Sequence, residues 1–306
     1  MPPVSTPSAN RPVDRVTAAL ERARRENPAW SATGPASDIL RNVFVPRGPA
    51  MGRPTQDSDR QVIVYTTTRV QAASNEQLRA RHVVGPGSDA RFTQAVHRLR
   101  TQVVAAMRKS GWNTLAVVSP SGGEGRTLSA INLAMSIAIE RDQTCLLVDA
   151  DLRHPTIHDY FGLPPATGGL ANFLTQRAPL ESLLINPGVE RLVLLPGGRP
   201  QRYATELFAS PRMADLVSEL RARYTDRFIV FDVPALLKTD DARTLLPLVD
   251  AVLLVVEEGR TTRYELARAQ GLLRSSNVLG VVLNKSRATP ESSAGWFTRL
   301  LNRRGV

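Results

Sequence analysis

The chain has 306 residues, 42% of them hydrophobic, so it can bury one full domain core and leave further segments outside it. A formal net charge of +11 favours an anionic partner, but the 5% aromatic content includes no basic stripe interleaved with aromatics, which argues against a single-stranded nucleic-acid platform. No apolar run approaches the roughly 20 residues of a membrane span, no secretory signal starts the chain, and the single cysteine, Cys145, excludes an intrachain disulfide framework. These features predict a soluble, cytoplasmic protein with no nucleic-acid partner.

The first part of the chain, residues 1–88, is rich in Pro, Ser, Arg and Ala, and its prolines interrupt every long element. It is predicted to be a largely flexible N-terminal region. Residues 15–27 place apolar side chains on one helical face, which fits either a short docking helix or a transient helix in a linker. Residues 61–68 have the β-branched content of a short strand.

From residue 89 onward, apolar runs of strand length alternate with helical patterns, which is typical of an α/β domain with a mostly parallel sheet and helices on both faces. This predicted domain spans residues 89–288, and a basic tail covers 289–306. Strands are predicted at 115–118, 145–148, 192–195, 228–231, 251–256 and 278–283, and helices at 91–109, 127–140, 211–224 and 262–275. Ligands bind at the carboxyl ends of the strands in such sheets, so the residues after each run are the candidates for function.

A glycine-rich loop follows the first predicted strand and leads directly into a helix. Glycines let backbone N–H groups turn inward around phosphate oxygens, and the start of the helix attracts the same anion. The loop departs from the usual phosphate-binding pattern, with Pro120 in place of a glycine and Arg126 in place of a lysine, and the alternative is an ordinary strand-to-helix turn. The predicted nucleotide-binding residues here are Ser121, Gly122, Gly123, Glu124, Gly125, Arg126, Thr127 and Leu128.

Carboxylates follow two more of the predicted strands. Asp149 and Asp151 come after the second strand, and Asp232 follows the run 228–231. The first pair alone also fits a solvated acidic turn, but three strand ends that offer phosphate-directed or cation-directed groups favour a Mg²⁺ site. Of Asp149 and Asp151, one carboxylate can lie on a bound cation or its water and the other near the transferred phosphate, while Asp232 can hold Mg²⁺ directly or through water. The hydroxyl of Thr127 can reach the same cation.

Residues 89–284 resemble the bacterial tyrosine kinases, which carry a protein-kinase activity on a P-loop fold. The resemblance lies in Gly123-Glu124-Gly125 with Thr127, in Asp149-x-Asp151-x-Arg153-x-Pro155, and in Asp232-Val233-Pro234, with further similarity at 195–198, 206–207, 241–242 and 280–284. Within that family the sequence is similar to the cytoplasmic kinases of exopolysaccharide loci, which pair with a membrane chain-length protein.

The resemblance implies ATP and Mg²⁺ as cofactors and phosphoryl transfer to tyrosine, in the control of exopolysaccharide or capsule chain length and export. By it, Asp149 helps to activate the tyrosine hydroxyl, Asp151 and Asp232 arrange Mg²⁺ with Thr127, and Asn284 lies near the adenine. Arg126 replaces the usual lysine at the terminal phosphates, so the catalytic residues implied are Asp149, Asp151 and Arg126. Arg153 is left between a phosphate contact, a contact between protomers and a surface position.

Several features depart from the family. The helix before the loop has Gln94, His97 and Arg100 where members often carry Glu-x-x-Arg-x-x-Arg, used between protomers, and no tyrosine follows Asn284. The implied partners are a membrane chain-length-determinant protein, a homo-oligomer, and an anionic membrane surface contacted by the basic tail, with the protein peripheral at the inner face of the cell membrane. Two alternatives remain: a nucleotide-sensing pseudokinase or regulatory subunit, and a partition-type ATPase, which Ser121 disfavours because that class carries a lysine there.

Overall fold

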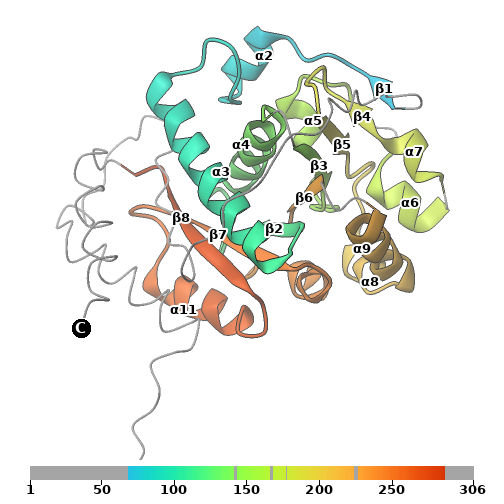
Figure 1. Cartoon of the computed structure of the whole chain (residues 1–306). Helices are drawn as coiled ribbons and strands as arrows, with labels where there is room; N and C mark the ends of the chain where they lie inside the picture. Colours follow the sequence, from blue (N-terminus) through green and yellow to red (C-terminus); the bar gives the residue numbers. More distant parts are fainter. Residues whose placement is uncertain (1–67, 141–142, 166–167, 177, 224–226, 287–306) are drawn as a thin grey trace, which may run out of the picture.

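A computed structural model describes residues 68–140, 143–165, 168–176, 178–223 and 227–286. Its centre is an eight-stranded sheet with the order β1-β4-β5-β3-β6-β2-β7-β8 (Figure 1). Every described strand pair is parallel except β4 with β5. The strands are β1 (Arg69–Val70), β2 (Thr114–Val118), β3 (Thr144–Asp149), β4 (Ile185–Asn186), β5 (Leu192–Leu195), β6 (Arg227–Asp232), β7 (Ala251–Glu257) and β8 (Val278–Asn284).

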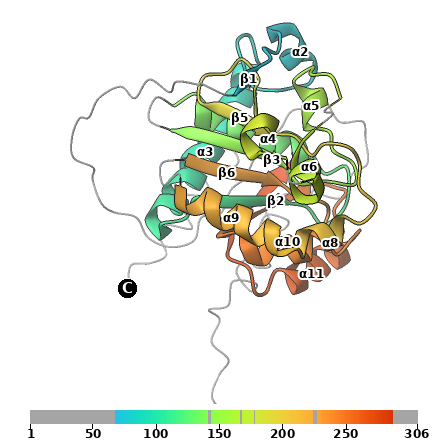
Figure 2. The same ribbon diagram turned by 90° about the vertical axis from the view of Figure 1, so that its right-hand side faces the viewer.

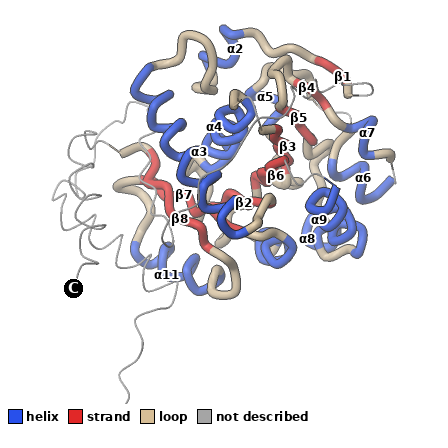
Figure 3. Tube along the Cα trace, viewed as in Figure 1, coloured by secondary structure: helices blue, strands red, loops and turns tan. Residues whose placement is uncertain are grey.

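Helices cover both faces of the sheet, as the colouring by secondary structure in Figure 3 shows. One core contains side chains of α3 and α4, and the other contains side chains of α6, α8, α9, α10 and α11, which lie on the opposite side of the strands (Figure 2). The helices are α2 (Asn75–Ala80), α3 (Ala90–Ser110), α4 (Arg126–Ala138), α5 (Ile157–Tyr160), α6 (Leu170–Gln176), α7 (Leu180–Leu183), α8 (Ala204–Phe208), α9 (Pro211–Arg223), α10 (Asp241–Leu245) and α11 (Arg263–Leu272), with a 3-10 turn at Leu246–Leu248.

Successive side chains of each central strand point to opposite faces of the sheet and so contribute to the two cores in turn. In β2, Leu115 and Val117 pack with α3 and α4, whereas Ala116 and Val118 pack into the opposite core. Because both faces are covered, every residue of β2 is buried, which is why the sequence shows continuous apolar runs rather than alternating polarity. Cys145 on β3 is fully buried, as predicted. The predicted α/β fold with a mostly parallel, doubly covered sheet is confirmed.

Residues that precede the predicted domain also pack against it. Leu78, Val83 and Val84 are buried, and Gln71 donates its backbone N–H to the carbonyl of Asn186 at 2.8 Å. The Asn132 side chain of α4 accepts the N–H of Val84 at 2.7 Å. The structure therefore differs from the boundary expected at residue 89, because part of 68–88 belongs to the packed unit.

Several expectations concern residues that the structure does not describe. The helix at 15–27, all but the last residue of the strand at 61–68, and the basic tail at 289–306 lie outside the described residues. Within the described ranges, none of the helices combines the length and apolar character needed to cross a membrane.

Candidate active site

The candidate functional residues lie at the carboxyl edge of the sheet, in the order that the strands dictate. From β3 through β6, β2 and β7 to β8, the strand ends carry Asp149, Asp232, the glycine-rich loop, Glu257 and Asn284. Asp149 and Asp232 are direct partners in the pairing of β3 with β6. The topology thus brings together distant residues such as Glu124 and Asn284, which are 160 positions apart in the sequence.

The loop between β2 and α4 has the backbone of an anion cradle. Gly123 and Gly125 have φ values of +84° and +85°, a region that residues with a Cβ rarely adopt. A methyl group on Gly125 would also overlap the amide Nδ2 of Asn284. Gly125 is the N-cap of α4, which runs for 13 residues, and no side chain caps it. Its first backbone N–H groups therefore remain available to an anion.

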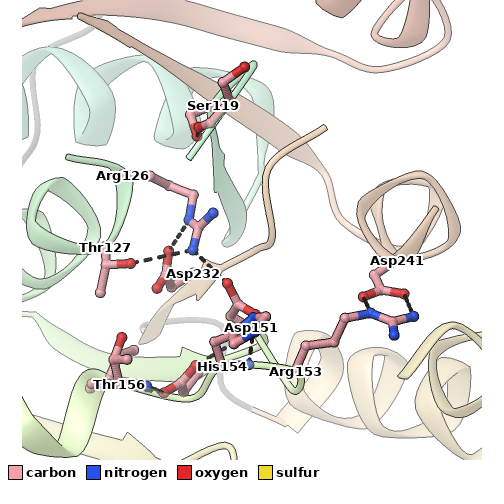
Figure 4. Close-up of polar contacts among 12 residues, drawn as sticks. Ser119, Arg126, Thr127, Asp151, Arg153, His154, Thr156, Asp232 and Asp241 are labelled. Carbon is pink, nitrogen blue, oxygen red and sulfur yellow. Dashed lines mark hydrogen bonds and ion pairs between the residues drawn. The ribbon is translucent and has the colours of Figure 1, made fainter. Parts of the chain in front are cut away.

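Arg126 lies at the centre of the site, where its guanidinium meets the three predicted metal-directed residues (Figure 4). Its Nε donates to Oδ1 of Asp232 at 2.7 Å, and its Nη2 donates to Oδ2 of Asp151 at 2.9 Å. The same Nη2 lies 3.4 Å from the hydroxyl of Thr127. Burial opposes the charge on Arg126, but Asp232 and Asp151 outweigh it and raise the pKa of the guanidinium. The arginine is therefore a buried cation held by two carboxylates.

Asp232 is only half satisfied by this contact. The residue is fully buried, and its Oδ2 has no hydrogen-bond partner. Burial raises the pKa of Asp232, and the nearby Arg126 and the Thr127 side chain oppose that shift. A buried carboxylate oxygen without a partner is costly, and such atoms in native proteins call for a ligand, an ion or a water.

In Asp149, by contrast, both carboxylate oxygens accept hydrogen bonds from backbone N–H groups. Its Oδ2 accepts the N–H groups of Thr156 and Ile157 at 2.9 and 3.0 Å, and its Oδ1 accepts that of Asp151 at 3.2 Å. Burial, reinforced by Asp232, raises the pKa of Asp149 well above its usual range. The side chain fixes the turn after β3, and that turn carries Asp151.

On its outer side the glycine-rich loop is braced by the segment after β7. Glu124 is buried; its Oε2 accepts the N–H of Ser121 at 2.9 Å and its Oε1 accepts the hydroxyl of Thr261 at 2.5 Å. The Ser121 hydroxyl donates to Glu265 at 2.6 Å, which also completes the capping box of α11. Burial raises the pKa of Glu124 despite these hydrogen bonds. The shape of the loop thus depends on the start of α11.

Asn284 belongs to the same brace. Its Nδ2 donates to the carbonyl of Glu124 at 2.8 Å, and its Oδ1 accepts the N–H of Lys285 at 2.9 Å. Both ends of the amide therefore bind backbone groups of the chain itself. Leu128, also predicted at the nucleotide site, is partly buried and packs against the apolar cluster of Val84, Phe92 and Val96.

Three cations lie over the loop that the sequence analysis did not select. Methyl groups on Gly122 and Gly123 would come within 2.5 Å of Lys238 Nζ and 2.6 Å of Arg260 Nη1. Lys285 donates its Nζ to the carbonyl of Gly123 and to Glu257, both at 3.0 Å. Each of the three follows the end of a strand by one to six residues. The rule that ligands bind at strand ends, applied to cations as well as carboxylates, could have found them.

Comparison with known proteins decides the family. No family model matches the chain. The tyrosine-protein kinase YwqD of Bacillus subtilis is 30% identical over 201 residues, which are 65% of this chain and 83% of that relative. This chain belongs to the bacterial tyrosine-protein kinases. The family and the class of enzyme predicted from the sequence are thereby confirmed.

Two further relatives define the context of this bacterial tyrosine kinase. The succinoglycan biosynthesis transport protein ExoP of Rhizobium meliloti is 33% identical over 177 residues, which are 56% of this chain but 22% of that relative. The solved kinase domain of the Escherichia coli tyrosine kinase ETK is 28% identical and superposes with a TM-score of 0.59, covering 65% of this chain and 78% of that domain.

Arg153 of the kinase is bound within its own chain. Its Nε and Nη2 donate to Oδ2 and Oδ1 of Asp241 at 2.7 and 3.0 Å (Figure 4). Its Nη1 donates to the carbonyl of Arg202 at 2.8 Å. Asp241 is fully buried at the start of α10 and also accepts the hydroxyl of Thr205. Of the three roles considered for Arg153, the structure supports none directly, because this ion pair joins the turn after β3 to α8 and α10.

The residues of α3 that differ from the family pattern also make contacts within the chain. Arg100 forms an ion pair with Glu140 at 2.8 Å and lies 3.4 Å from the carbonyl of Ser136, so it ties α3 to the end of α4. Burial and the neighbouring Arg100 lower the pKa of His97. Among the described residues, no cluster of three or more His, Cys, Asp or Glu side chains has a metal-binding arrangement.

Proposed function

We propose that this kinase binds ATP with Mg²⁺ at the carboxyl edge of the sheet and transfers the terminal phosphoryl group to tyrosine. The observation that carries the proposal is the contact of Arg126 with Asp151, Asp232 and Thr127 at the start of α4. A phosphate-directed cation, two cation-directed carboxylates and a hydroxyl converge beside the glycine-rich loop, which is the set that phosphoryl transfer requires.

The residues present fit a magnesium ion. Asp232 Oδ2 is buried and without a partner, and carboxylate and hydroxyl oxygens are the ligands that Mg²⁺ prefers. Asp151, Asp232 and Thr127 would hold the ion, which when bound neutralises negative charge on the phosphates. The N–H groups from Gly122 to Leu128 would orient the phosphates, and Arg126 would contact the terminal ones.

Asp149 and Asp151 have different roles in the proposed site. Asp149 is implied as the group that activates the tyrosine hydroxyl, yet its oxygens accept backbone N–H groups on the inner side of the turn. We propose that it acts by positioning Asp151, which is the more accessible of the two carboxylates. Asn284 in turn would act on the adenine side by holding the carbonyl of Glu124.

Incubating the purified protein with labelled ATP and Mg²⁺ tests the function. Labelled tyrosine supports the kinase, release of phosphate alone supports a partition-type ATPase, and nucleotide binding without either supports a sensor or pseudokinase. Asp232→Asn is the matched control, because it removes one cation-directed charge and no side-chain volume. Tyrosine labelling that is equal in the control protein would contradict the proposed site.

The tyrosines among the described residues differ in how exposed they are, and an acceptor must be exposed. Tyr203 and Tyr264 are 73% and 71% exposed, whereas Tyr160 is partly buried and its pKa is raised by burial. We propose Tyr203 and Tyr264 as the acceptors accessible to a second copy of the chain. Mass spectrometry of the labelled protein, compared with Tyr203→Phe and Tyr264→Phe, would locate the modification.

The pathway and partners are proposed from the relatives. A family that includes a succinoglycan biosynthesis transport protein supports a role in the chain length and export of an extracellular polysaccharide. A membrane chain-length protein is the expected partner and would hold the kinase at the inner face of the cell membrane, with the basic tail 289–306 against anionic lipid. Polymer length in a strain that carries Asp232→Asn, compared with the parent strain, tests this role.

A further inference from the structure

We propose that Arg126 is a built-in counter-ion of the metal site: without nucleotide its guanidinium fills the position between Asp151 and Asp232, so a divalent cation binds there only after phosphates draw the arginine away. The proposal rests on the proposed Mg²⁺-ATP function for the identity of those phosphates. Its main measurement, however, uses neither nucleotide nor phosphoryl transfer.

The first support is that one side chain contacts all three groups assigned to the cation. Arg126 uses Nε for Asp232 and Nη2 for both Asp151 and Thr127. Its side chain is only 12% exposed, so the contact is not a surface ion pair that solvent screens. A hydrated cation bound between Asp151 and Asp232 would occupy the position that this guanidinium fills, and therefore the two exclude each other.

Electrostatics gives the second support. Asp151 and Asp232 lie on either side of one guanidinium, and Asp232 is fully buried. Removing Arg126 would leave two carboxylates close together with no cation between them, which is strongly unfavourable in a buried site. The vacant Oδ2 of Asp232 shows that the guanidinium does not use the full binding capacity of the pair. A divalent cation would supply both the missing charge and the missing contact.

The choice of arginine gives the third support. The planar fork separates Nε–H from Nη2–H, so the guanidinium can bridge two carboxylates at 2.7 and 2.9 Å at the same time. A lysine ammonium is a compact point charge and holds such a pair less rigidly. Arg126 is the first residue of α4, so its side chain can turn toward phosphates in the loop without movement of the helix. Arginine at this position should therefore suppress metal binding more strongly than lysine.

Titration with Mn²⁺ in the absence of nucleotide, followed by the loss of the free-ion electron paramagnetic resonance signal, tests the proposal. The wild-type protein should bind Mn²⁺ at least about tenfold more weakly than Arg126→Gln. The variant removes the charge-assisted hydrogen bonds of the guanidinium, so the carboxylates of Asp151 and Asp232 become available to the cation. Arg126→Lys should fall between the two. Adding Asp232→Asn to Arg126→Gln should abolish the gain, which would place the ion at this site.

Arg221→Gln is the matched control, because Arg221 pairs with Asp250, which directly precedes β7 at the edge of the sheet opposite the glycine-rich loop. It removes the same charge and should leave Mn²⁺ affinity at the wild-type value. A similar gain in this control would overturn the proposal, since the effect would then come from net charge alone.

Two further results would overturn it. One is Mn²⁺ binding by the wild type as tight as by Arg126→Gln. The other is a folded Arg126→Gln, by circular dichroism, with no gain in affinity. If that variant does not fold, Arg126→Lys decides the matter, since affinity equal to the wild type would contradict the counter-ion role. Failure of the kinase assay leaves all of these outcomes unchanged, so the two proposals fail separately.

Discussion

Two arginines at the carboxyl edge of the sheet bind buried carboxylates in different ways. Arg153 meets one carboxylate, that of Asp241, through two hydrogen bonds, and a third N–H reaches a backbone carbonyl. Arg126 meets two carboxylates with one hydrogen bond each, and one oxygen of Asp232 has no partner. Both pairs include a fully buried aspartate, although the Arg153 side chain is 30% exposed and that of Arg126 is 12% exposed.

The difference indicates which ion pair is structural and which is functional. A buried pair whose donors and acceptors are all used has nothing left to offer a ligand, and breaking it costs stability. A pair that leaves a buried oxygen unused can exchange its partner for a cation or a phosphate. On this criterion Arg153 holds the turn after β3 in place, and we propose that Arg126 takes part in the chemistry.

The largest effect is expected at the incompletely satisfied pair. Asp151→Asn and Asp232→Asn should each lower tyrosine phosphorylation by at least about 100-fold, because each removes charge that stabilises the transferred phosphoryl group. Neither removes core volume, so the melting temperature should change by only a few degrees. Turnover of both variants with labelled ATP, beside thermal melting, provides the check. Normal turnover in both would leave the Arg126 cluster without a catalytic role.

Arg153→Ala should act on stability instead. It leaves the buried Asp241 without its main partner, which costs about 3 kcal/mol, or a fall in melting temperature of roughly 6–12 °C for a domain of this size. Urea unfolding of Arg153→Ala, Asp241→Ala and the double variant would measure the coupling between the two side chains. If Arg153→Ala keeps its stability but loses turnover, Arg153 has a functional role and not only a structural one.

Changes at Arg126 itself should be moderate and specific to nucleotide. Arg126→Ala removes a charge-assisted hydrogen bond worth about 1.5–3 kcal/mol, so ATP affinity should fall at least roughly tenfold. Arg126→Lys keeps the charge and should bind ATP nearly as well as the wild type. Calorimetric titration of all three proteins makes the comparison. Equal affinities would mean that Arg126 does not turn toward the phosphates, and the pseudokinase would become the better interpretation.

The smallest effect is expected at Glu124, whose carboxylate oxygens are both occupied. Its raised pKa means that the folded chain holds the proton more tightly than the unfolded chain. Stability should therefore fall as pH rises from the ordinary glutamate value of 4.5 toward the folded-state pKa. Glu124→Gln removes this titration, so the wild type should lose stability relative to the variant over that range. If the free energies of unfolding of the two proteins change with pH in the same way, the raised pKa of Glu124 is excluded.

The amino-acid sequence was sufficient for the fold and for the location of the candidate site. Six strand runs and four helices were predicted where β2, β3, β5 to β8, α3, α4, α9 and α11 occur, because their apolar periods are long and both faces of the sheet are buried. The glycine-rich loop, Asp151 and Asp232 were found because they directly follow strands. No comparable local signal marks β1 or β4, each of two residues, and β1 forms by pairing with β4, which lies far along the chain.

The partner of each charged group was decided only by the tertiary structure. Arg153 pairs with Asp241 across 88 positions and Arg126 with Asp232 across 106, and no local pattern encodes such contacts. The packing of Val83 and Val84 against α3 and α4 likewise depends on a surface formed by later residues. The sequence could therefore determine which charged groups reach the carboxyl edge of the sheet, because strand direction and length are local properties. Which of those groups remain incompletely paired depends on distances between strands and helices, and these are fixed only when the chain packs.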